Sequence, residues 1–377
     1  MGLFRLLLAI VIVTNHTGNS FHYYMLGGRG LAPECFFIIS GFYMSLVLNE
    51  VYLKSHKISF SELYNFYSNR FLRILPVYWI FLLLRIIASV VCLKLNCCPE
   101  QTATLIFWQK HFDSLTPTSA IALIFSNIMV FGLDLCITFL NVGADGGLFF
   151  SVHQTPMWAG LFIFIPPAWA LGTIFIFYLI SPFLVRKNIV WILSLIGASF
   201  LARILAFRLT QYGLFSNKVF PLELAMFLLG IVSYRMYIAI SAKRDKYLLW
   251  GKVAWISIVA VTLGYPLLPS TQTFPHFYSD DRIIYVTLLM LSIPFIFLVS
   301  KESIVDRFLG ELSYPLYICH FMVILFFGYP MDHERPLAEV AMIFLISMIL
   351  SLASVLLVVQ PINRWRRIRV QTKKVIN

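Results

Sequence analysis

The sequence predicts an all-α integral membrane protein with about ten transmembrane helices. Hydrophobic residues make up 60% of the 377 residues, whereas charged residues make up only 12%. Soluble domains are about 45–50% apolar and about 25% charged, so the composition excludes a soluble enzyme, a disordered chain and a disulfide scaffold. The apolar runs are long and continuous instead of alternating every second residue, which argues against a transmembrane barrel.

Ten segments are long and apolar enough to cross a bilayer. They are residues 3–24, 31–49, 74–95, 168–185, 189–207, 219–240, 248–268, 283–300, 313–331 and 337–359. We interpret 3–24 as a retained first span, because Thr14-Asn15-His16-Thr17 is a poor signal-peptide cleavage site. Residues 119–140 and 157–167 are also apolar, and they allow either an extra hairpin or a re-entrant segment.

Basic residues fall on every second connection between these spans, which predicts the orientation of the chain. Lys and Arg concentrate in the cytoplasmic loops of membrane proteins. Here they occur at Arg5, between the second and third spans, after residues 185, 234 and 300, and in the tail from Arg364 to Lys374. We therefore expect two cytoplasmic termini and a single membrane domain over 1–377, with the lipid bilayer as partner. The net charge of +12 follows from this topology and predicts no nucleic-acid partner.

Arg5 and His16 are the first polar pair inside an apolar run. They are eleven residues apart, which places them on one helix face about 16 Å apart along the axis. A charge at mid-bilayer costs about 2.5–3.5 kcal/mol on insertion scales, so it usually marks function. Glu34 lies one turn into the second span, and the short connection 25–30 should bring it beside His16. The alternatives are a packing histidine and an interfacial acid that faces headgroups.

Further candidates lie where the second cytoplasmic loop meets the third span, and inside the third and later spans. Arg70 and Arg73 share a helix face at i, i+3, and they form either a phosphate clamp or ordinary cytoplasmic charge. Arg85 either lines a pore or extends its charged end to the membrane surface. Glu223 and His320 are each either site residues or structural polar contacts.

The six cysteines do not predict a metal or redox site. Three of them lie inside apolar runs and resemble small hydrophobic residues, namely Cys35, Cys136 and Cys319. The other three cluster but lack a C-x-x-C or Cys/His spacing, namely Cys92, Cys97 and Cys98. We therefore expect no metal and no permanently bound cofactor.

Several motifs, taken in order, resemble the acyltransferase-3 family, the multi-pass membrane O-acyltransferases that modify bacterial surface glycans. The early motifs are Arg5-x10-His16, the segment from Glu34 to Ser40-Gly41-Phe42, and Arg70-Phe71-Leu72-Arg73 with the residues up to Trp79. The later motifs are Pro167-Ala168-Trp169-Ala170-Leu171-Gly172 leading to Tyr178, and Ser313-Tyr314-Pro315-Leu316-Tyr317 with His320. The resemblance runs from Arg5 to Gln360-Pro361.

The resemblance implies a bacterial cytoplasmic-membrane enzyme that moves an acyl group from a cytosolic thioester, such as acetyl-CoA, to a hydroxyl group of a glycan. It implies functional importance for Arg5, His16, the Arg70 and Arg73 pair, and Ser40-Gly41-Phe42. Glycan-assembly proteins are candidate partners. Two positions depart from the family pattern: Ile174 replaces the glutamate five residues after Trp169, and Gln360 replaces the acid before the terminal proline.

Acyl transfer to an alcohol needs a base, a stabilised oxyanion and a held thioester. We assign the base to His16, oriented by Glu34, and the donor phosphates to Arg70 and Arg73. Arg5 would guide the donor or stabilise negative charge. Ser40 is an acyl relay, an oxyanion donor or a helix-packing contact. Trp169, Tyr178, Glu223 and His320 complete the set as supporting residues.

A different class of function also fits many helices with intramembrane charges. The chain would then be a glycan or lipid transporter, or an inactive partner in a glycan-assembly complex. A transporter should contain paired broken helices in two related halves. Here, by contrast, the diagnostic residues cluster before residue 80.

Overall fold

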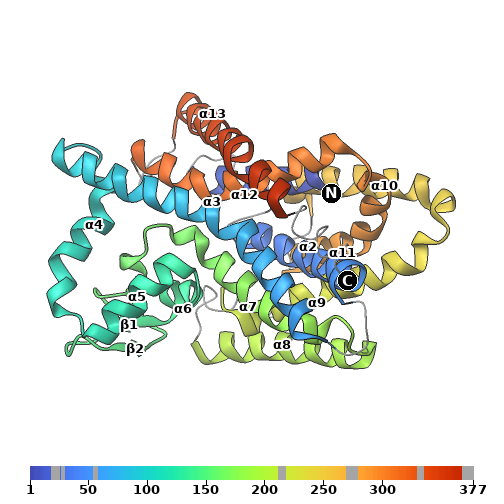
Figure 1. The fold of residues 1–377 in the computed structure, drawn as a ribbon, viewed down its shortest axis with the longest axis horizontal. Coiled ribbons are helices and arrows are strands. Elements are labelled where there is room, and N and C mark those ends of the chain that lie inside the picture. The colour runs from blue at the N-terminus through green and yellow to red at the C-terminus, as the bar shows by residue number, and fades with distance from the viewer. Residues whose placement is uncertain are drawn as a thin grey trace.

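Helices dominate the computed structural model, which describes residues 1–17, 26, 30–53, 58–210, 218–268, 279–328 and 335–366. Thirteen α-helices occur in this part of the chain (Figure 1). The first six are α1 (Gly2–His16), α2 (Leu31–Val47), α3 (Phe60–Lys94), α4 (Pro99–His111), α5 (Pro117–Met129) and α6 (Leu133–Thr138). The others are α7 (Trp169–Leu184), α8 (Ile189–Thr210), α9 (Phe220–Ser241), α10 (Arg244–Leu263), α11 (Asp280–Ser300), α12 (Ile304–Phe326) and α13 (Leu337–Ser354).

Within the described ranges, nine helices are long and apolar enough to cross a membrane. The prediction of an all-α, multi-pass membrane protein is therefore confirmed. These nine include the helices expected at 31–49, 189–207 and 219–240. The remaining predicted span, 3–24, corresponds to the 15-residue helix α1. Residues 18–24 of this predicted span lie outside the described part of the chain.

Helix α3 is 35 residues long and begins well before the predicted span 74–95. A capping box starts it, in which Ser59 Oγ accepts a hydrogen bond from Glu62 N and Glu62 Oε2 accepts one from Ser59 N. The first turns are polar, so hydropathy alone does not mark them as part of the span. This extension places Arg70 and Arg73 on continuous helix, which fixes the spacing of their Cα atoms.

Residues 117–168 do not form an extra membrane-spanning hairpin. After α5 and the six-residue helix α6, the chain forms a two-stranded antiparallel sheet, β1 (Leu140–Val142) and β2 (Leu148–Phe150). Two short 3-10 turns follow, at Ala159–Phe162 and Pro166–Ala168. A span needs about 20 residues of helix, and these pieces are all shorter. In Figure 1, α5, α6 and the two strands lie beside α4.

Two glycines let α2 and α9 cross closely. A Cβ atom at Gly41 would lie 1.9 Å from the carbonyl oxygen of Phe227, and one at Gly230 would lie 2.0 Å from that of Ile38. Any side chain at either position would therefore push the helices apart. Phe42, the next residue, packs edge-on against the rings of Tyr234, Tyr237 and Phe297. Gly41 and Phe42 thus contribute packing to the segment singled out in the sequence.

Helices α1 and α12 begin at the same level and run in the same direction. The carboxylate of Asp306 accepts hydrogen bonds from Gly2 N at 2.7 Å and Leu3 N at 3.0 Å, which caps the first turn of α1. Gly2 also lies against the backbone of Asp306 and Gly310. His16 follows Gly2 by fourteen residues, and His320 follows Asp306 by fourteen residues. Each interval corresponds to about 21 Å along the helix. The parallel packing therefore places these two histidines at the same depth.

Asp134 on α6 is a buried acid outside the long helices. Its Oδ2 accepts a 3.4 Å hydrogen bond from Phe220 N, and its Oδ1 has no hydrogen-bond partner in the described structure. Burial raises its pKa from the ordinary 3.8 to about 6. Between about pH 4 and pH 6 the folded protein therefore keeps a proton on Asp134 that the unfolded chain releases.

We expect Asp134→Asn to stabilise the fold at pH 8 and to change it little at pH 4. Below about pH 4 the Asp134 carboxyl is neutral in both states and does not destabilise the fold. As the pH rises through about 6, the buried carboxyl ionises, and the free energy of unfolding falls by ~3 kcal/mol. Asparagine does not ionise and avoids this loss. The measurement is unfolding of both proteins in detergent from pH 4 to 8, with the exposed Asp113→Asn as control. A stability difference that does not vary with pH would contradict the assignment.

Candidate functional site

A wide cavity of about 550 Å³ opens between the starts of α1 and α12, residues 69–73 of α3 and the end of the C-terminal helix, which continues α13 as far as Arg366. Five basic side chains line it: Arg5, Arg73, Lys301, Arg307 and Arg366. Two acidic side chains, Asp306 and Glu311, also line it. Asp306 already accepts the backbone N–H groups of α1, and Glu311 Oε1 accepts a hydrogen bond from Asn363 Nδ2 at 3.1 Å. The wide cavity therefore favours anions.

A narrow cavity of about 140 Å³ continues from the wide cavity into the helix bundle. The two share seven lining residues: Arg5, Tyr43, Val47, Arg73, Gly310, Glu311 and Asn363. The inner wall of the narrow cavity includes Ile12 of α1 and Tyr317 of α12. These residues precede His16 and His320 by one helical turn. The combined cavity therefore extends from a basic entrance to the turns that carry the two histidines.

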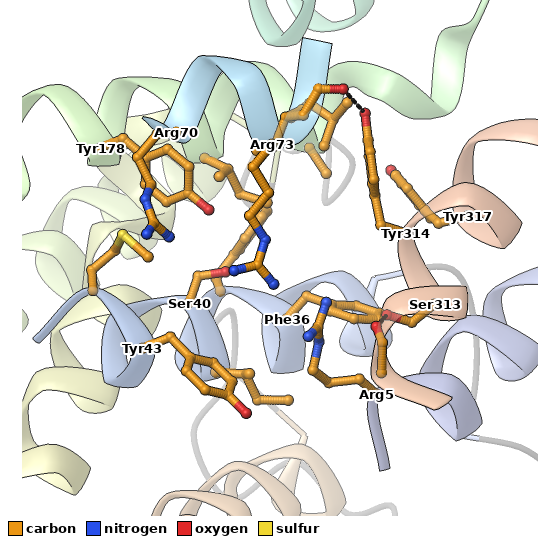
Figure 2. A pocket seen from close by; sticks show the side chains of 18 of the residues that line it. Arg5, Phe36, Ser40, Tyr43, Arg70, Arg73, Tyr178, Ser313, Tyr314 and Tyr317 are labelled. Atoms are coloured by element: carbon orange, nitrogen blue, oxygen red, sulfur yellow. Dashed lines mark hydrogen bonds between the residues drawn. The ribbon is translucent and has the colours of Figure 1, made fainter. Parts of the chain in front are cut away.

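Three arginines converge on the narrow cavity. Figure 2 shows Arg5, Arg70 and Arg73 extending into it from α1 and α3. In the described structure none of the three lies within ion-pair distance of a carboxylate, and the guanidinium of Arg70 rests over the ring of Phe66 at 5.6 Å. Unneutralised guanidinium groups in a cavity are suited to bind phosphate or carboxylate groups, because their paired N–H donors match the oxygens. The three guanidinium groups together form a candidate anion site, in which Arg5 joins the predicted pair.

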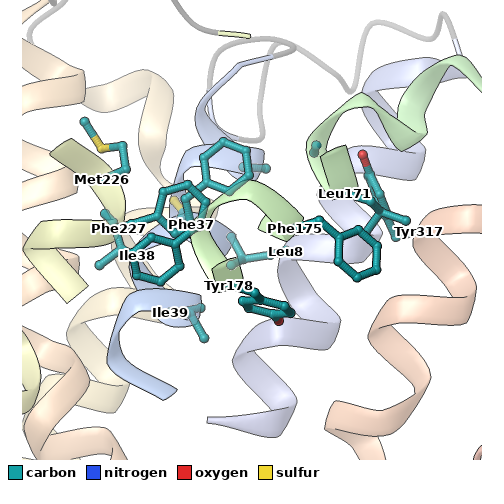
Figure 3. Packing of buried hydrophobic residues seen from close by; sticks show 14 of the residues in the cluster. Leu8, Phe37, Ile38, Ile39, Leu171, Phe175, Tyr178, Met226, Phe227 and Tyr317 are labelled. Atoms are coloured by element: carbon teal, nitrogen blue, oxygen red, sulfur yellow. The ribbon is translucent and has the colours of Figure 1, made fainter. Parts of the chain in front are cut away.

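The rest of the narrow cavity is mainly apolar and aromatic. Ser40 and Tyr43 of α2 and Tyr314 of α12 face it in Figure 2, and Tyr178 also lines it. Ile174 lies in its wall, so the position where the family resemblance implies a glutamate is here an apolar part of the cavity. Figure 3 shows the supporting packing, in which Phe37, Leu171, Phe175 and Tyr178 belong to the central hydrophobic cluster. Trp169 contributes to this packing, with its ring 6.1 Å from that of Phe37.

His16 lies against His320, with His16 Nδ1 3.2 Å from His320 Nε2. His16 Nδ1 also lies 2.9 Å from the carbonyl oxygen of Ile12, and His320 Nδ1 lies 2.7 Å from that of Tyr317. A carbonyl oxygen only accepts hydrogen bonds, so each Nδ1 carries the proton. His320 Nε2 then accepts from His16 Nδ1, and the basic lone pair of His16 resides on Nε2. This arrangement fixes one tautomer of His16.

Glu34 does not form the predicted pair with His16. Its Oε1 instead forms a 3.1 Å ion pair with Nη1 of Arg203 on α8, and Glu223 Oε2 lies 3.1 Å from Nη2 of the same arginine. All three side chains are buried, and Arg203 also donates to the carbonyl oxygen of Leu222. Glu34 and Glu223 therefore belong to a buried ion cluster that joins α2, α8 and α9. His320 takes the place beside His16 that was predicted for Glu34.

Arg85 lines neither of the two cavities described above, and it does not extend to the surface. It is 1% exposed and donates through Nη1 to Ser89 Oγ, Gln101 O and Gln101 Oε1. Gln101 Nε2 in turn donates to the carbonyl oxygen of Met322. Arg85 therefore braces α3 against α4 and α12.

Comparison with known protein families gives one match. A family model described as an acyltransferase domain matches residues 1–359. No curated protein and no solved structure matches the chain.

Proposed function

This chain belongs to the acyltransferase-3 family, and from that premise we propose that it moves an acyl group from an acyl-CoA to a hydroxyl group of a surface or exported glycan. Acetyl is the acyl group proposed first. The observation that supports this most is the cavity that joins the basic entrance to the turns carrying His16 and His320. A phosphate-bearing donor with a long flexible arm fits such a shape, because its phosphates and its thioester need separate environments.

The donor would bind with its phosphates among Arg5, Arg73, Arg307 and Arg366. Charge-assisted hydrogen bonds to phosphate oxygens would hold it there. The thioester end would extend past Ser40 and Tyr314 into the narrow cavity. Ile174 makes this part of the cavity wall apolar where the family resemblance implies a glutamate, which suits a small apolar acyl group such as acetyl.

His16 would act as the general base. Its Nε2 would take the proton of the acceptor hydroxyl as the hydroxyl oxygen bonds to the thioester carbon. The carbon–sulfur bond then breaks, the CoA thiolate leaves, and the proton returns to that sulfur from His16. His320 acts as a positioning residue, because its Nε2 accepts from His16 Nδ1 and keeps the lone pair on the reacting nitrogen.

The wide cavity would open to the cytoplasm of a bacterial inner membrane, with both termini on that side. Basic residues cluster at its entrance and in the adjoining loops, as expected for cytoplasmic loops. The acceptor glycan would then approach His16 from the opposite side.

The test is transfer of radiolabelled acetyl-CoA to glycan by the full-length protein in proteoliposomes. The acceptor is surface glycan from cells that lack the protein. Label that appears in the glycan supports the proposal. Acetyl-CoA that remains intact, in an assay in which a known acyltransferase is active, overturns it. Mass spectrometry of the cellular glycan separates the alternative: loss of one acyl unit without the protein indicates acyl transfer, and loss of the glycan itself indicates transport.

Arg73→Ala is expected to raise the KM for acetyl-CoA roughly 10- to 100-fold with little change in the KM for glycan. A charged hydrogen bond to phosphate contributes about 1.5–3 kcal/mol. Arg73 is the cleaner probe, because it is exposed and Arg70 is 5% exposed against Phe66. Arg73→Lys should recover only part of the loss, since lysine lacks the paired donors. Lys252→Ala removes an exposed charge outside both cavities and serves as control. An unchanged donor KM in Arg73→Ala would exclude a phosphate contact.

A further inference from the structure

Three thiols meet where α3 ends and α4 begins, at the left-hand end of the molecule in Figure 1. Cys92 lies in the last turns of α3, and Cys97 and Cys98 lie in the connection to α4. Their sulfur atoms all lie within 4.8 Å of one another. The spacing in the sequence does not indicate this, because a helix end and a tight turn bring the residues together. We propose that these three cysteines bind one thiophilic metal ion, Cu(I), in a site separate from the cavity.

The backbone of the turn is shaped to gather the three sulfur atoms. Asn96 and Cys98 have positive φ angles of 50° and 48°, which non-glycine residues rarely adopt. Cys97 N donates a 3.0 Å hydrogen bond to the carbonyl oxygen of Cys92, which closes the turn. Strained backbone of this kind costs on the order of 1–3 kcal/mol per residue and persists where the surroundings hold it.

The surroundings here are the brace built on Arg85. Ser89 Oγ donates to the carbonyl oxygen of Gln101 at 2.8 Å, and Arg85 reaches both residues. Ser89 lies one turn before Cys92, and Gln101 lies one turn after Cys98. The brace therefore fixes the two helix ends that carry the thiols, and the three ligands need little rearrangement to bind an ion.

The donor set selects the metal. The three ligand atoms found together in the described residues are all sulfur, which favours soft ions over Mg²⁺ or Ca²⁺. Structural zinc sites use four ligands, whereas Cu(I) accepts three thiolates. With metal–sulfur bonds of about 2.3 Å, a trigonal site has sulfur atoms about 4 Å apart, so the cluster needs to contract only slightly. Binding would release the three thiol protons to solvent.

Access to the site is also provided. Cys92 is buried, Cys98 is half-buried and Cys97 is exposed. An ion can therefore bind Cys97 from outside first, and the thiols of Cys98 and Cys92 can then complete its coordination.

The test uses the full-length protein in detergent with a reductant and Cu(I) supplied through a coloured competing chelator. We expect one Cu(I) per chain to leave the chelator, and X-ray absorption to show sulfur ligands at about 2.3 Å. Cys92→Ser, Cys97→Ser and Cys98→Ser should each lower the affinity at least tenfold. Cys136→Ser changes a buried cysteine elsewhere and should bind as the wild type does. Cys97 is exposed, so its variant should fold even if Cys92→Ser does not.

A second measurement follows the stability of the fold. An ion that binds only the folded state raises the unfolding temperature. Cu(I) should raise it in the wild type and in Cys136→Ser but not in Cys97→Ser. Equal Cu(I) uptake by Cys97→Ser and the wild type would overturn the proposal. So would tighter retention of zinc than of Cu(I), or a disulfide within the cluster accompanied by no Cu(I) uptake after reduction.

Discussion

Replacing His16 with alanine is expected to lower the rate of acyl transfer by about 10²- to 10⁴-fold, the usual loss when a general base is removed. The loss should appear in kcat at saturating acetyl-CoA, because His16 lies beyond the arginines that would hold the donor. Insertion and folding should persist, since the main helix contacts of α1 come from its apolar residues. The measurement is kcat in proteoliposomes with matched protein amounts. His153→Ala alters an exposed histidine and is the control. A normally folded His16→Ala with nearly wild-type kcat would remove His16 from the mechanism.

The same experiment tests the part played by His320. His320→Ala should lower kcat by less than His16→Ala does, because Ile12 still accepts from His16 Nδ1. If His320 acts only through His16, the double variant should be no slower than His16→Ala alone. Losses that simply add would show that His320 acts separately. This cycle distinguishes a positioning residue from a structural one, since a structural loss would also reduce the amount of folded protein.

The helical class and most of the spans follow from composition and apolar runs. Length alone decides whether an apolar run crosses a bilayer, and nine of the predicted spans correspond to long helices in the described residues. The predictions of spans are wrong where an apolar run is short or where proline or polar residues interrupt it. Residues 157–167 are apolar but contain Pro166 and Pro167, and they form turns instead of a span.

Several candidate residues from the sequence line or adjoin the two cavities, but the pairing expected between Glu34 and His16 is absent from the described structure. Arg5 and His16 are candidates because they are polar residues of an apolar run, and Arg70 and Arg73 because they share a helix face. The three arginines line the narrow cavity, and His16 lies one turn beyond Ile12 in its wall. Sequence proximity suggested Glu34 as the neighbour of His16, but helix packing decided otherwise. The parallel contact of α1 and α12 joins residues 304 positions apart, and no local pattern indicates such a contact.

Arg203 was missed although a signal for it was present. It lies inside the predicted span 189–207, where any charged residue deserves to be treated as a candidate. Asn363 and Arg366, which line the wide cavity from the C-terminal helix, looked like ordinary cytoplasmic residues of the tail. Only the return of that helix to the start of α3 gives them a place in the site, with Arg366 Nε donating to Asn69 Oδ1 at 3.2 Å.

Arg203→Leu is expected to destabilise the fold by about 3–5 kcal/mol, the cost of removing one partner from a buried ion pair. Arg203 is 3% exposed, and Glu34 and Glu223 are both fully buried. Without the guanidinium, two carboxylates would remain close together with neither water nor this counter-charge. The measurement is unfolding in detergent, supported by the yield of monodisperse protein. Arg244→Leu breaks an exposed ion pair with Glu302 and should change stability little, because solvent screens it.

A further variant shows whether Arg203→Leu destabilises the fold through lost charge or through lost packing. Neutralising both acids in Arg203→Leu/Glu34→Gln/Glu223→Gln should restore most of the stability, since an uncharged cluster leaves no uncompensated charge. If the triple variant is as unstable as Arg203→Leu alone, the volume of the arginine matters and its charge does not. Glu34→Gln by itself carries a further consequence for the site. Because Glu34 pairs with Arg203 and not with His16, the pH–rate profile should keep its shape while stability falls. A shifted profile in Glu34→Gln would place the carboxylate back in contact with the base and contradict the ion cluster described here.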